Sequence, residues 1–287
     1  MKKYFKLLRV KHYIKNLLIF VPAFFGKAIL DINTLLNLFI AFFCFSFVAS
    51  AIYVINDIRD CDLDRQHEEK RSRPIAAGEI TKAQALIIAS LITVVAFVGV
   101  LWLGHWKITA AFIYLGLYII LNLIYSFGAK RLAIVDILIL ASGFVIRTIY
   151  GASVANIECS SWLLLLIMTL SLYLGIGKRR NELIKTDNCN TREVLKKYSV
   201  KYLDNMMRTF LTLSLVFYSL WSAGIDSPNK ERSVWSLPFV VAIVMRYELD
   251  IEHSSYGDPV ETIYKDKILV MTVFAYAVVM FYLIYGV

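Results

Sequence analysis

Four aspartates within eight residues are the first feature of this sequence that could perform chemistry. They lie in the run Asn56–Asp64, at the end of a long apolar segment. On a helix, Asp57, Asp60 and Asp64 fall within roughly 60° of one another, and Asp62 points about 140° away. Three carboxylates on one face repel one another unless a cation lies between them, and all-oxygen sites suit Mg²⁺ bridged to phosphate. The spacing therefore predicts a magnesium site with Asp62 left in solvent. A plain charged helix end is the alternative.

A basic loop follows the acidic run and ends at Gly78. Arginine binds phosphate as a two-pronged donor, and lysine binds it as a point charge. The loop is therefore a candidate phosphate-binding segment, although ordinary positive charge beside a membrane would also explain a basic loop. Its candidate residues are Lys70, Arg71 and Arg73, with His67 as a neighbouring catalytic candidate.

A second basic segment begins at Lys178, far along the chain. Lys178 and Glu182 are four residues apart and share a helix face, and Arg179 lies between them. A basic cluster combined with an acidic one suits two anionic substrates, one arriving with Mg²⁺ and the other met by lysine and arginine. Membrane-surface charge is again the alternative.

Two charged residues, Asp136 and Arg147, lie inside an apolar run. On a helix they are about 16 Å apart along the axis, which is too far for an ion pair. Charges inside a membrane normally face a cavity or a partner. Each is therefore expected to find another partner, Asp136 in the polar site and Arg147 in a structural pair or on substrate.

Long apolar runs supply the elements that must position these side chains. The 287-residue chain is 59% hydrophobic and 18% charged, and its apolar residues gather in continuous blocks. Such blocks cross roughly 30 Å of hydrocarbon, and they indicate helices because they do not alternate apolar with polar residues. We expect an all-α, polytopic membrane protein with about nine transmembrane helices in one bundle. The expected spans are 17–30, 35–55, 83–103, 108–127, 132–155, 161–177, 205–225, 234–246 and 267–286, of which the first and eighth are short.

Basic residues are distributed unevenly among the connections. They are dense in the N-terminal arm and in the loops at about 56–82 and 178–204, and sparse on the other side. By the positive-inside rule the dense set is cytoplasmic, with the N-terminus inside. The net charge of +9 thus orients the chain in a membrane, and no nucleic-acid partner is expected. The four cysteines lack CxxC pairing, which argues against a disulfide framework or a zinc site. One domain, 1–287, with these two active-site loops is the simplest organisation.

The linked motifs resemble the UbiA superfamily of intramembrane prenyltransferases. Asn-Asp-x-x-Asp-x-x-x-Asp followed by Lys-Arg-x-Arg-Pro-Ile-Ala-x-Gly is similar to the first aspartate-rich motif of that family and the loop after it. The resemblance implies a nine-helix bundle and a Mg²⁺-diphosphate site. Other segments resemble its decaprenyl-phosphate phosphoribosyltransferase branch, and the sequence departs from that branch at Val10, His12 and Tyr13. The resembling segments are Lys15-Asn16, Tyr125-Ser126, Lys130, Asp136, Gly143–Arg147 and Gly175–Leu183.

The resemblance implies a Mg²⁺-dependent transferase of cell wall biosynthesis, multi-pass in a bacterial inner (plasma) membrane. It would move 5-phosphoribose from 5-phosphoribosyl 1-diphosphate to a polyprenyl (decaprenyl-type) phosphate and release pyrophosphate. Asp57, Asp60 and Asp64 would be the catalytic and metal-binding residues. The substrate-binding residues would be Lys15, Asn16, Asn56, Lys70, Arg71, Arg73, Tyr125, Lys130, Asp136, Lys178, Arg179 and Glu182.

Two rival functions remain at this stage, and homo-oligomerisation is left open. The first is ordinary UbiA-type transfer of a polyprenyl chain to an aromatic or other small acceptor. Ordinary members of the superfamily carry a second aspartate-rich motif after the sixth span. This chain has Lys178, Arg179, Arg180 and Glu182 there instead, and the absence of the second acidic motif disfavours ordinary prenyl transfer. The second is a membrane transporter, whose charges should line a path near the bilayer midplane. The charges here cluster instead at span ends.

Overall fold

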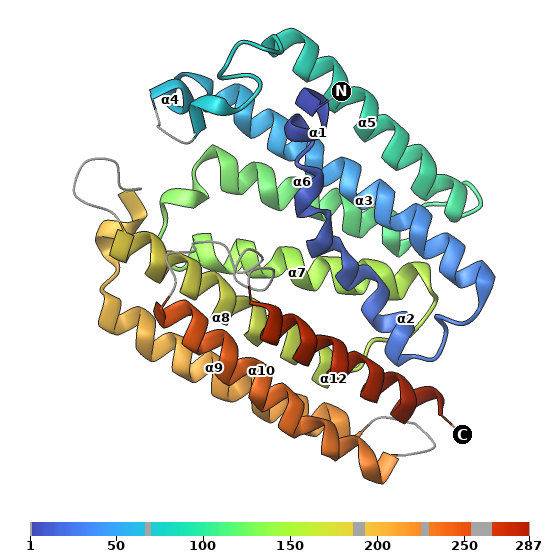
Figure 1. The fold of residues 1–287 in the computed structure, drawn as a ribbon. Coiled ribbons are helices and arrows are strands. Elements are labelled where there is room, and N and C mark those ends of the chain that lie inside the picture. The colour runs from blue at the N-terminus through green and yellow to red at the C-terminus, as the bar shows by residue number, and fades with distance from the viewer. Residues whose placement is uncertain (1, 67–69, 186–192, 225–229, 254–265, 287) are drawn as a thin grey trace. The chain divides into compact units, whose positions relative to one another are not determined.

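Every regular element of the chain is a helix in the ranges that the structure describes. The computed structural model describes residues 2–66, 70–185, 193–224, 230–253 and 266–286. Figure 1 shows the helices along the chain, which divides into two compact units. The first contains 1–127 and 146–158, and the second contains 128–145 and 159–287. The all-α prediction is confirmed.

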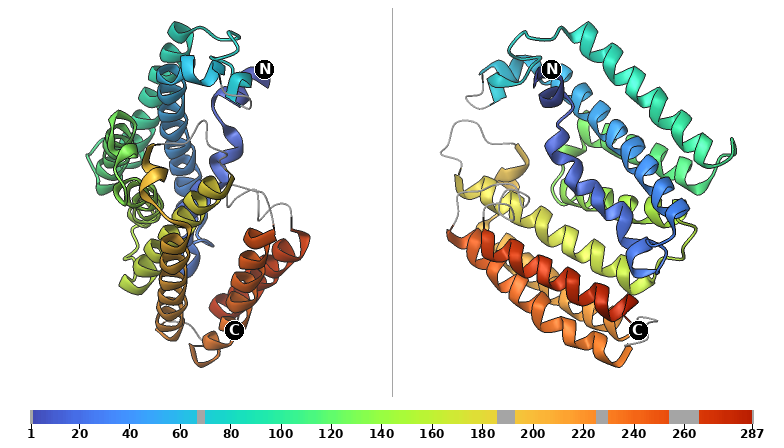
Figure 2. Two further views of the ribbon diagram at one scale, coloured as in Figure 1. Left: turned by 90° about the vertical axis from the view of Figure 1, so that its left-hand side faces the viewer. Right: turned by 45° about the vertical axis from the view of Figure 1, so that its right-hand side comes forward.

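The first unit is built around α3 (Ile32–Arg59), which is 61% buried over its most apolar window, against 17% for α5 (Lys82–Leu103). Asp31 begins α3 by accepting a hydrogen bond from the backbone of Thr34, and a capping box of Thr81 and Gln84 begins α5. The N-terminal segment runs beside α3 in two views (Figures 1 and 2). The other elements are α1 (Lys2–Leu7), η1 (Val10–Phe20), α2 (Val21–Phe25), α4 (Cys61–Gln66), η2 (Lys70–Ser72), α6 (Ala110–Phe127) and the end of α7 (Val135–Val154).

Small residues let α3 and α5 pack closely. A Cβ on Gly99 of α5 would lie 2.6 Å from the sulfur of Cys44 on α3. Buried alanines, including Ala49 on α3 and Ala89 and Ala96 on α5, continue this close contact along both helices. Small side chains are what helices in a membrane need, because association there depends on van der Waals packing and not on water exclusion.

The second unit is centred on α8 (Ser161–Lys185) and α9 (Val200–Ala223), which lie side by side. Its core joins α8 residues such as Leu172 and Ile176 to Leu203 and Met207 of α9. The remaining elements are η3 (Ala129–Arg131), the start of α7, η4 (Glu193–Lys197), η5 (Lys230–Ser236), α10 (Leu237–His253) and α12 (Lys267–Tyr285).

Six of the described helices are long and apolar enough to cross a membrane: α3, α5, α6, α7, α8 and α12. The chain is thus a multi-pass membrane protein by the length and composition of its helices. The predicted count of nine spans is not confirmed by these six and stays a prediction.

The two short predicted spans have different explanations. The first, at 17–30, is irregular: a 3₁₀-helix is followed by α2, which has Pro22 in its first turn and ends before Gly26. The eighth, predicted at 234–246, is shorter than the helix in the structure and ends too early. Its helix, α10, begins at Leu237 and continues to His253 through the acidic residues that end its apolar stretch.

A glycine on α7 tests how closely η1 packs in the first unit. A Cβ on Gly151 would lie 2.0 Å from the carbonyl oxygen of Ile19, a backbone atom that cannot rotate away. We expect Gly151→Ala to destabilise the protein by about 1–3 kcal/mol and to lower the thermal midpoint by about 3 °C or more. The matched control is Gly116→Ala on α6, where a Cβ meets nothing within 4 Å. Thermal unfolding in detergent measures both, and equal midpoints would contradict the close packing.

Candidate active site

The acidic run bends where α3 gives way to α4. Asp60 lies between the two helices with φ −89° and ψ 8°. The backbone N–H of Asp60 still donates to Asn56 (2.9 Å), and that of Asp64 still donates to Asp60 (2.8 Å). Helical spacing alone predicts one straight helix over this run, whereas the structure breaks it at Asp60. These two hydrogen bonds span the bend, and Asp57 and Asp64 both lie within reach of one arginine nitrogen.

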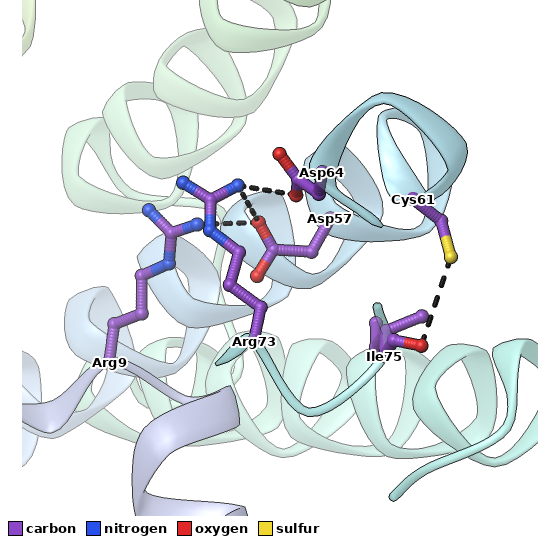
Figure 3. A network of polar contacts seen from close by, with 6 residues as sticks. All are labelled: Arg9, Asp57, Cys61, Asp64, Arg73 and Ile75. Carbon is purple, nitrogen blue, oxygen red and sulfur yellow. Dashed lines mark hydrogen bonds and ion pairs between the residues drawn. The ribbon is translucent and has the colours of Figure 1, made fainter. Parts of the chain in front are cut away.

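Two arginines hold these two carboxylates. Nη1 of Arg73 lies 3.1 Å from Oδ1 of Asp57 and 2.6 Å from Oδ2 of Asp64. Nη2 of Arg9 donates to the same Oδ1 of Asp57. The Asp57 and Asp64 side chains are only 4% and 6% exposed. Figure 3 shows both guanidinium groups pointing at the aspartates from two separate segments.

Buried apolar residues fix the loop that carries Arg73. Ile75 and Ile80 pack into the core beneath α3 and α5, and the thiol of Cys61 lies 3.8 Å from the carbonyl of Ile75 (Figure 3). Gly78 adopts φ +75°, a conformation that favours glycine, where the loop turns back to α5. The Arg-Pro-Ile-Ala-x-Gly stretch thus positions its arginine through packing as well as through charge.

Arg9 is a site residue that the sequence analysis missed. It lies between α1 and η1 with φ 50° and ψ 45°, and its guanidinium carbon is 4.6 Å from the ring centroid of Tyr53. The hydroxyl of Ser50 on α3 donates to the carbonyl of Leu8 (2.7 Å), which ties this arm down. In the sequence, Arg9 is one of several basic residues in the N-terminal arm. Only its ion pair with buried Asp57, seen in the structure, distinguishes it from the others.

The electrostatics of the cluster explain why cations are gathered here. Two carboxylates close enough to share one nitrogen repel each other by roughly 3 kcal/mol at an effective dielectric of 20. Burial raises the cost of leaving them unpaired. Arginine nitrogens supply the compensating positive charge.

The same geometry tests whether Mg²⁺ fits. One oxygen each of Asp57 and Asp64 faces a single cationic group, Nη1 of Arg73, as two carboxylate ligands of a divalent cation would face the ion. Within the described residues, no three His, Cys, Asp or Glu side chains gather closely enough to hold a metal. The pair fits a magnesium ion that also takes phosphate oxygens and waters, and a third ligand from Asp60 remains a prediction.

Asp62 behaves as predicted. Its side chain is 73% exposed, and its partners are Arg65 at 3.2 Å and Lys82 at 3.7 Å. Such exposed pairs contribute little stability. Asp62 therefore stands apart from buried Asp57 and Asp64, which lie five residues before it and two residues after it.

Asn16, a predicted substrate contact, lies in a buried polar network of the first unit. Its amide nitrogen donates to Ser46 (2.8 Å), and its amide oxygen accepts from Nε of Arg147 (2.7 Å). Arg147 also donates to the hydroxyl of Tyr118 (3.0 Å). Arg147 therefore has partners other than Asp136, as predicted. Asn16 serves here to orient an intramembrane arginine.

Asp136 forms a buried network in the second unit. Its Oδ2 lies 2.6 Å from Nε of Arg179, and these side chains are 0% and 1% exposed. Its Oδ1 accepts from the hydroxyl of Tyr198 (2.9 Å). Nη1 of Arg179 also meets Glu182 at 2.8 Å. Burial, together with the bond to Asp136, raises the pKa of Tyr198 to about 12, so this phenol keeps its proton at neutral pH.

The other predicted site residues occupy varied positions. Arg71 is exposed on η2, whereas the rest are half-buried. These lie on η1, α3, η2, the end of α6, η3 and α8: Lys15, Asn56, Lys70, Tyr125, Lys130 and Lys178. His67 lies outside the described residues.

Neighbouring arginines on α8 test whether Arg179 has a structural role. Arg179 is buried against Asp136, whereas Arg180 pairs with Asp204 in a partly exposed position. We expect Arg179→Gln to destabilise the protein by about 3 kcal/mol or more because it leaves Asp136 buried without its cation. Arg180→Gln should cost less than about 1 kcal/mol. Thermal unfolding of the two variants side by side gives the comparison, and equal losses would refute the distinction.

Comparison with known proteins agrees with this fold. Residues 18–244 match the UbiA prenyltransferase family. A decaprenyl-phosphate phosphoribosyltransferase of Mycolicibacterium smegmatis is 35% identical over 92% of this chain and 86% of its own length. One of Corynebacterium glutamicum is 34% identical over 92% of this chain and 81% of its own.

A solved structure gives the same result for the fold. The structure of a UbiA homolog from Archaeoglobus fulgidus bound to GPP and Mg²⁺ superposes with a TM-score of 0.69 at 17% identity, over 97% of this chain and 99% of that one. The matched residues cover most of the sequence and both units. The chain belongs to the UbiA prenyltransferase family.

Proposed function

We propose that this protein transfers 5-phosphoribose from 5-phosphoribosyl 1-diphosphate to a polyprenyl phosphate of the decaprenyl type, releasing pyrophosphate. The observation that carries the choice of substrates is the identity of 34–35% with two decaprenyl-phosphate phosphoribosyltransferases across nearly the whole chain. The acidic pair formed by Asp57 on α3 and Asp64 on α4 supports a diphosphate donor.

Asp57 and Asp64 would hold Mg²⁺ on the diphosphate, with Asp60 and Asn56 beside them. When bound, the ion neutralises charge that develops on the departing pyrophosphate. Arg9 and Arg73 lie on the same carboxylates and can bind phosphate oxygens as two-pronged donors. Departure of pyrophosphate leaves an electron-poor anomeric carbon, so stabilising this leaving group is the main catalytic task.

The acceptor requires little activation. A lipid phosphate is already ionised at neutral pH and can attack the anomeric carbon without a general base. Lysines are suited to orienting it and the 5-phosphate of the sugar, and we assign this role to Lys15, Lys130 and Lys178. Lys70, Arg71 and Tyr125 remain further candidates for sugar and phosphate contacts.

Arg179 receives a positioning role in this proposal. Its guanidinium is engaged by Asp136 and Glu182, so it holds the end of α8, and with it Lys178, next to α7. Asn16 similarly receives a positioning role, because its amide oxygen accepts a hydrogen bond from Arg147.

We propose that the chain acts as one domain in a bacterial inner membrane with its N-terminus in the cytoplasm. The unequal distribution of basic residues supports this orientation. It would place both active-site loops on the side where the phosphorylated sugar is available.

The assay supplies purified protein with Mg²⁺, 5-phosphoribosyl 1-diphosphate and polyprenyl phosphate, and mass spectrometry identifies the lipid product. We expect phosphoribosyl lipid from the native chain. Asp57→Asn or Asp64→Asn should lower the rate by about a hundredfold or more, because each removes a ligand of the ion that stabilises the leaving group. Asp62→Asn, which removes an exposed carboxylate from the same run, should keep most of the rate.

A second donor separates the proposal from ordinary prenyl transfer. The same protein is given a polyprenyl diphosphate and an aromatic acid. Prenylated acid, with no phosphoribosyl lipid in the first assay, would refute the proposed reaction. Equal rates for Asp62→Asn and Asp57→Asn would refute the site.

A further inference from the structure

We propose that Arg9 and Arg73 are resident counter-ions of the Asp57–Asp64 pair, and that a magnesium-bound diphosphate exchanges with them. On binding, the carboxylates pass from the guanidinium groups to the metal, and the guanidinium groups pass to the phosphate oxygens. This inference rests on the proposed function and adds to it the part played by the two arginines. It predicts that metal and diphosphate bind cooperatively.

The contacts of Arg73 carry the first part of the argument. One nitrogen of this side chain meets both carboxylates, at 3.1 Å and 2.6 Å, and so occupies the point on which their oxygens converge. A metal ion bound by both aspartates must compete for these same oxygens. Arg73 remains partly exposed and comes from a loop, so its side chain can turn to another anion without unfolding a helix.

Arg9 supplies an independent observation. Its backbone lies in the left-handed region, which costs a residue with a side chain about 1 kcal/mol or more and commonly marks a functional position. Its guanidinium lies 4.6 Å from the ring centroid of Tyr53. A planar cation held over a ring keeps its edge free to donate, to Asp57 here and to a phosphate after exchange.

Charge balance then gives the cooperativity. These four side chains carry two negative and two positive charges, so the cluster has no net charge to attract a divalent cation by itself. A diphosphate alone would meet the carboxylates as like charges. Together, the ion satisfies the carboxylates and the phosphates satisfy the arginines. Each ligand therefore strengthens the binding of the other by the same factor.

The test measures the affinity of the full chain in detergent for Mn²⁺, by electron paramagnetic resonance of the free ion, with and without pyrophosphate. Titrations without protein correct for the complex that Mn²⁺ and pyrophosphate form in solution. For the native protein we expect pyrophosphate to tighten Mn²⁺ binding by at least about tenfold. Arg73→Gln should bind Mn²⁺ alone about tenfold more tightly, because the competing cation is gone. It should also lose most of the pyrophosphate effect.

Companion variants keep the test decisive. Arg9→Gln should also bind Mn²⁺ alone more tightly and show a smaller pyrophosphate effect, with Arg73 left in place. This variant replaces Arg73→Gln in the test if Arg73→Gln does not fold. Arg73→Lys keeps the positive charge but loses the two-pronged guanidinium, so its Mn²⁺ affinity should lie between those of the native protein and Arg73→Gln. The control Lys82→Gln removes a cation that pairs with exposed Asp62, at 3.7 Å, and this variant should match the native protein.

Two outcomes would overturn the exchange. One is an arginine variant that binds Mn²⁺ alone no more tightly than the native chain. The other is a native chain that binds Mn²⁺ neither with pyrophosphate nor without it. The substrate assay is separate: phosphoribosyl lipid with unchanged Mn²⁺ affinities refutes the exchange alone, whereas the expected affinities without that product refute the proposed reaction alone.

Discussion

Two buried carboxylates, Asp57 near the end of α3 and Asp64 on α4, are the constraint on which the first unit depends. Burying two carboxylates this close together is costly unless cations reach them. Those cations come from two segments that are far from each other in sequence: the break between α1 and η1, and the loop before α5. The tethering of the N-terminal arm to α3 and the anchoring of Ile75 and Ile80 both serve this need.

The second unit also pairs a buried carboxylate with a cation, but there both partners are buried. Asp136 and Arg179 are almost fully enclosed, and they also bond to Tyr198 and Glu182, respectively. At the acidic pair, by contrast, the cations are the partly exposed members, at 22% for Arg9 and 27% for Arg73. An enclosed pair fixes two helices, whereas a pair with one accessible partner can change partners. In these two clusters the enclosed cation belongs to the structural pair, and the accessible cations belong to the candidate binding site.

The sequence predicted what depends on neighbours along the chain. Helical spacing separated Asp62 from Asp57 and Asp64, and rise per residue excluded an Asp136–Arg147 pair. What it missed depends on contacts between distant segments. No local pattern marks Arg9 among the basic residues of its arm. Arg179 sits in a run of cations that fits a phosphate site, and only the position of Asp136 reveals its structural pairing.

These differences bear on how a membrane fold can handle two phosphorylated substrates. Lipid provides no water to solvate charge, so a site must carry its own compensation before the substrates arrive. A cluster of acids alone would stay protonated or recruit any cation, and a cluster of bases alone would trap any anion. Pairing two aspartates with two partly exposed arginines avoids both outcomes. Since every charge already has a partner, a ligand must satisfy both signs to displace them, and a metal-bound diphosphate is a ligand that does.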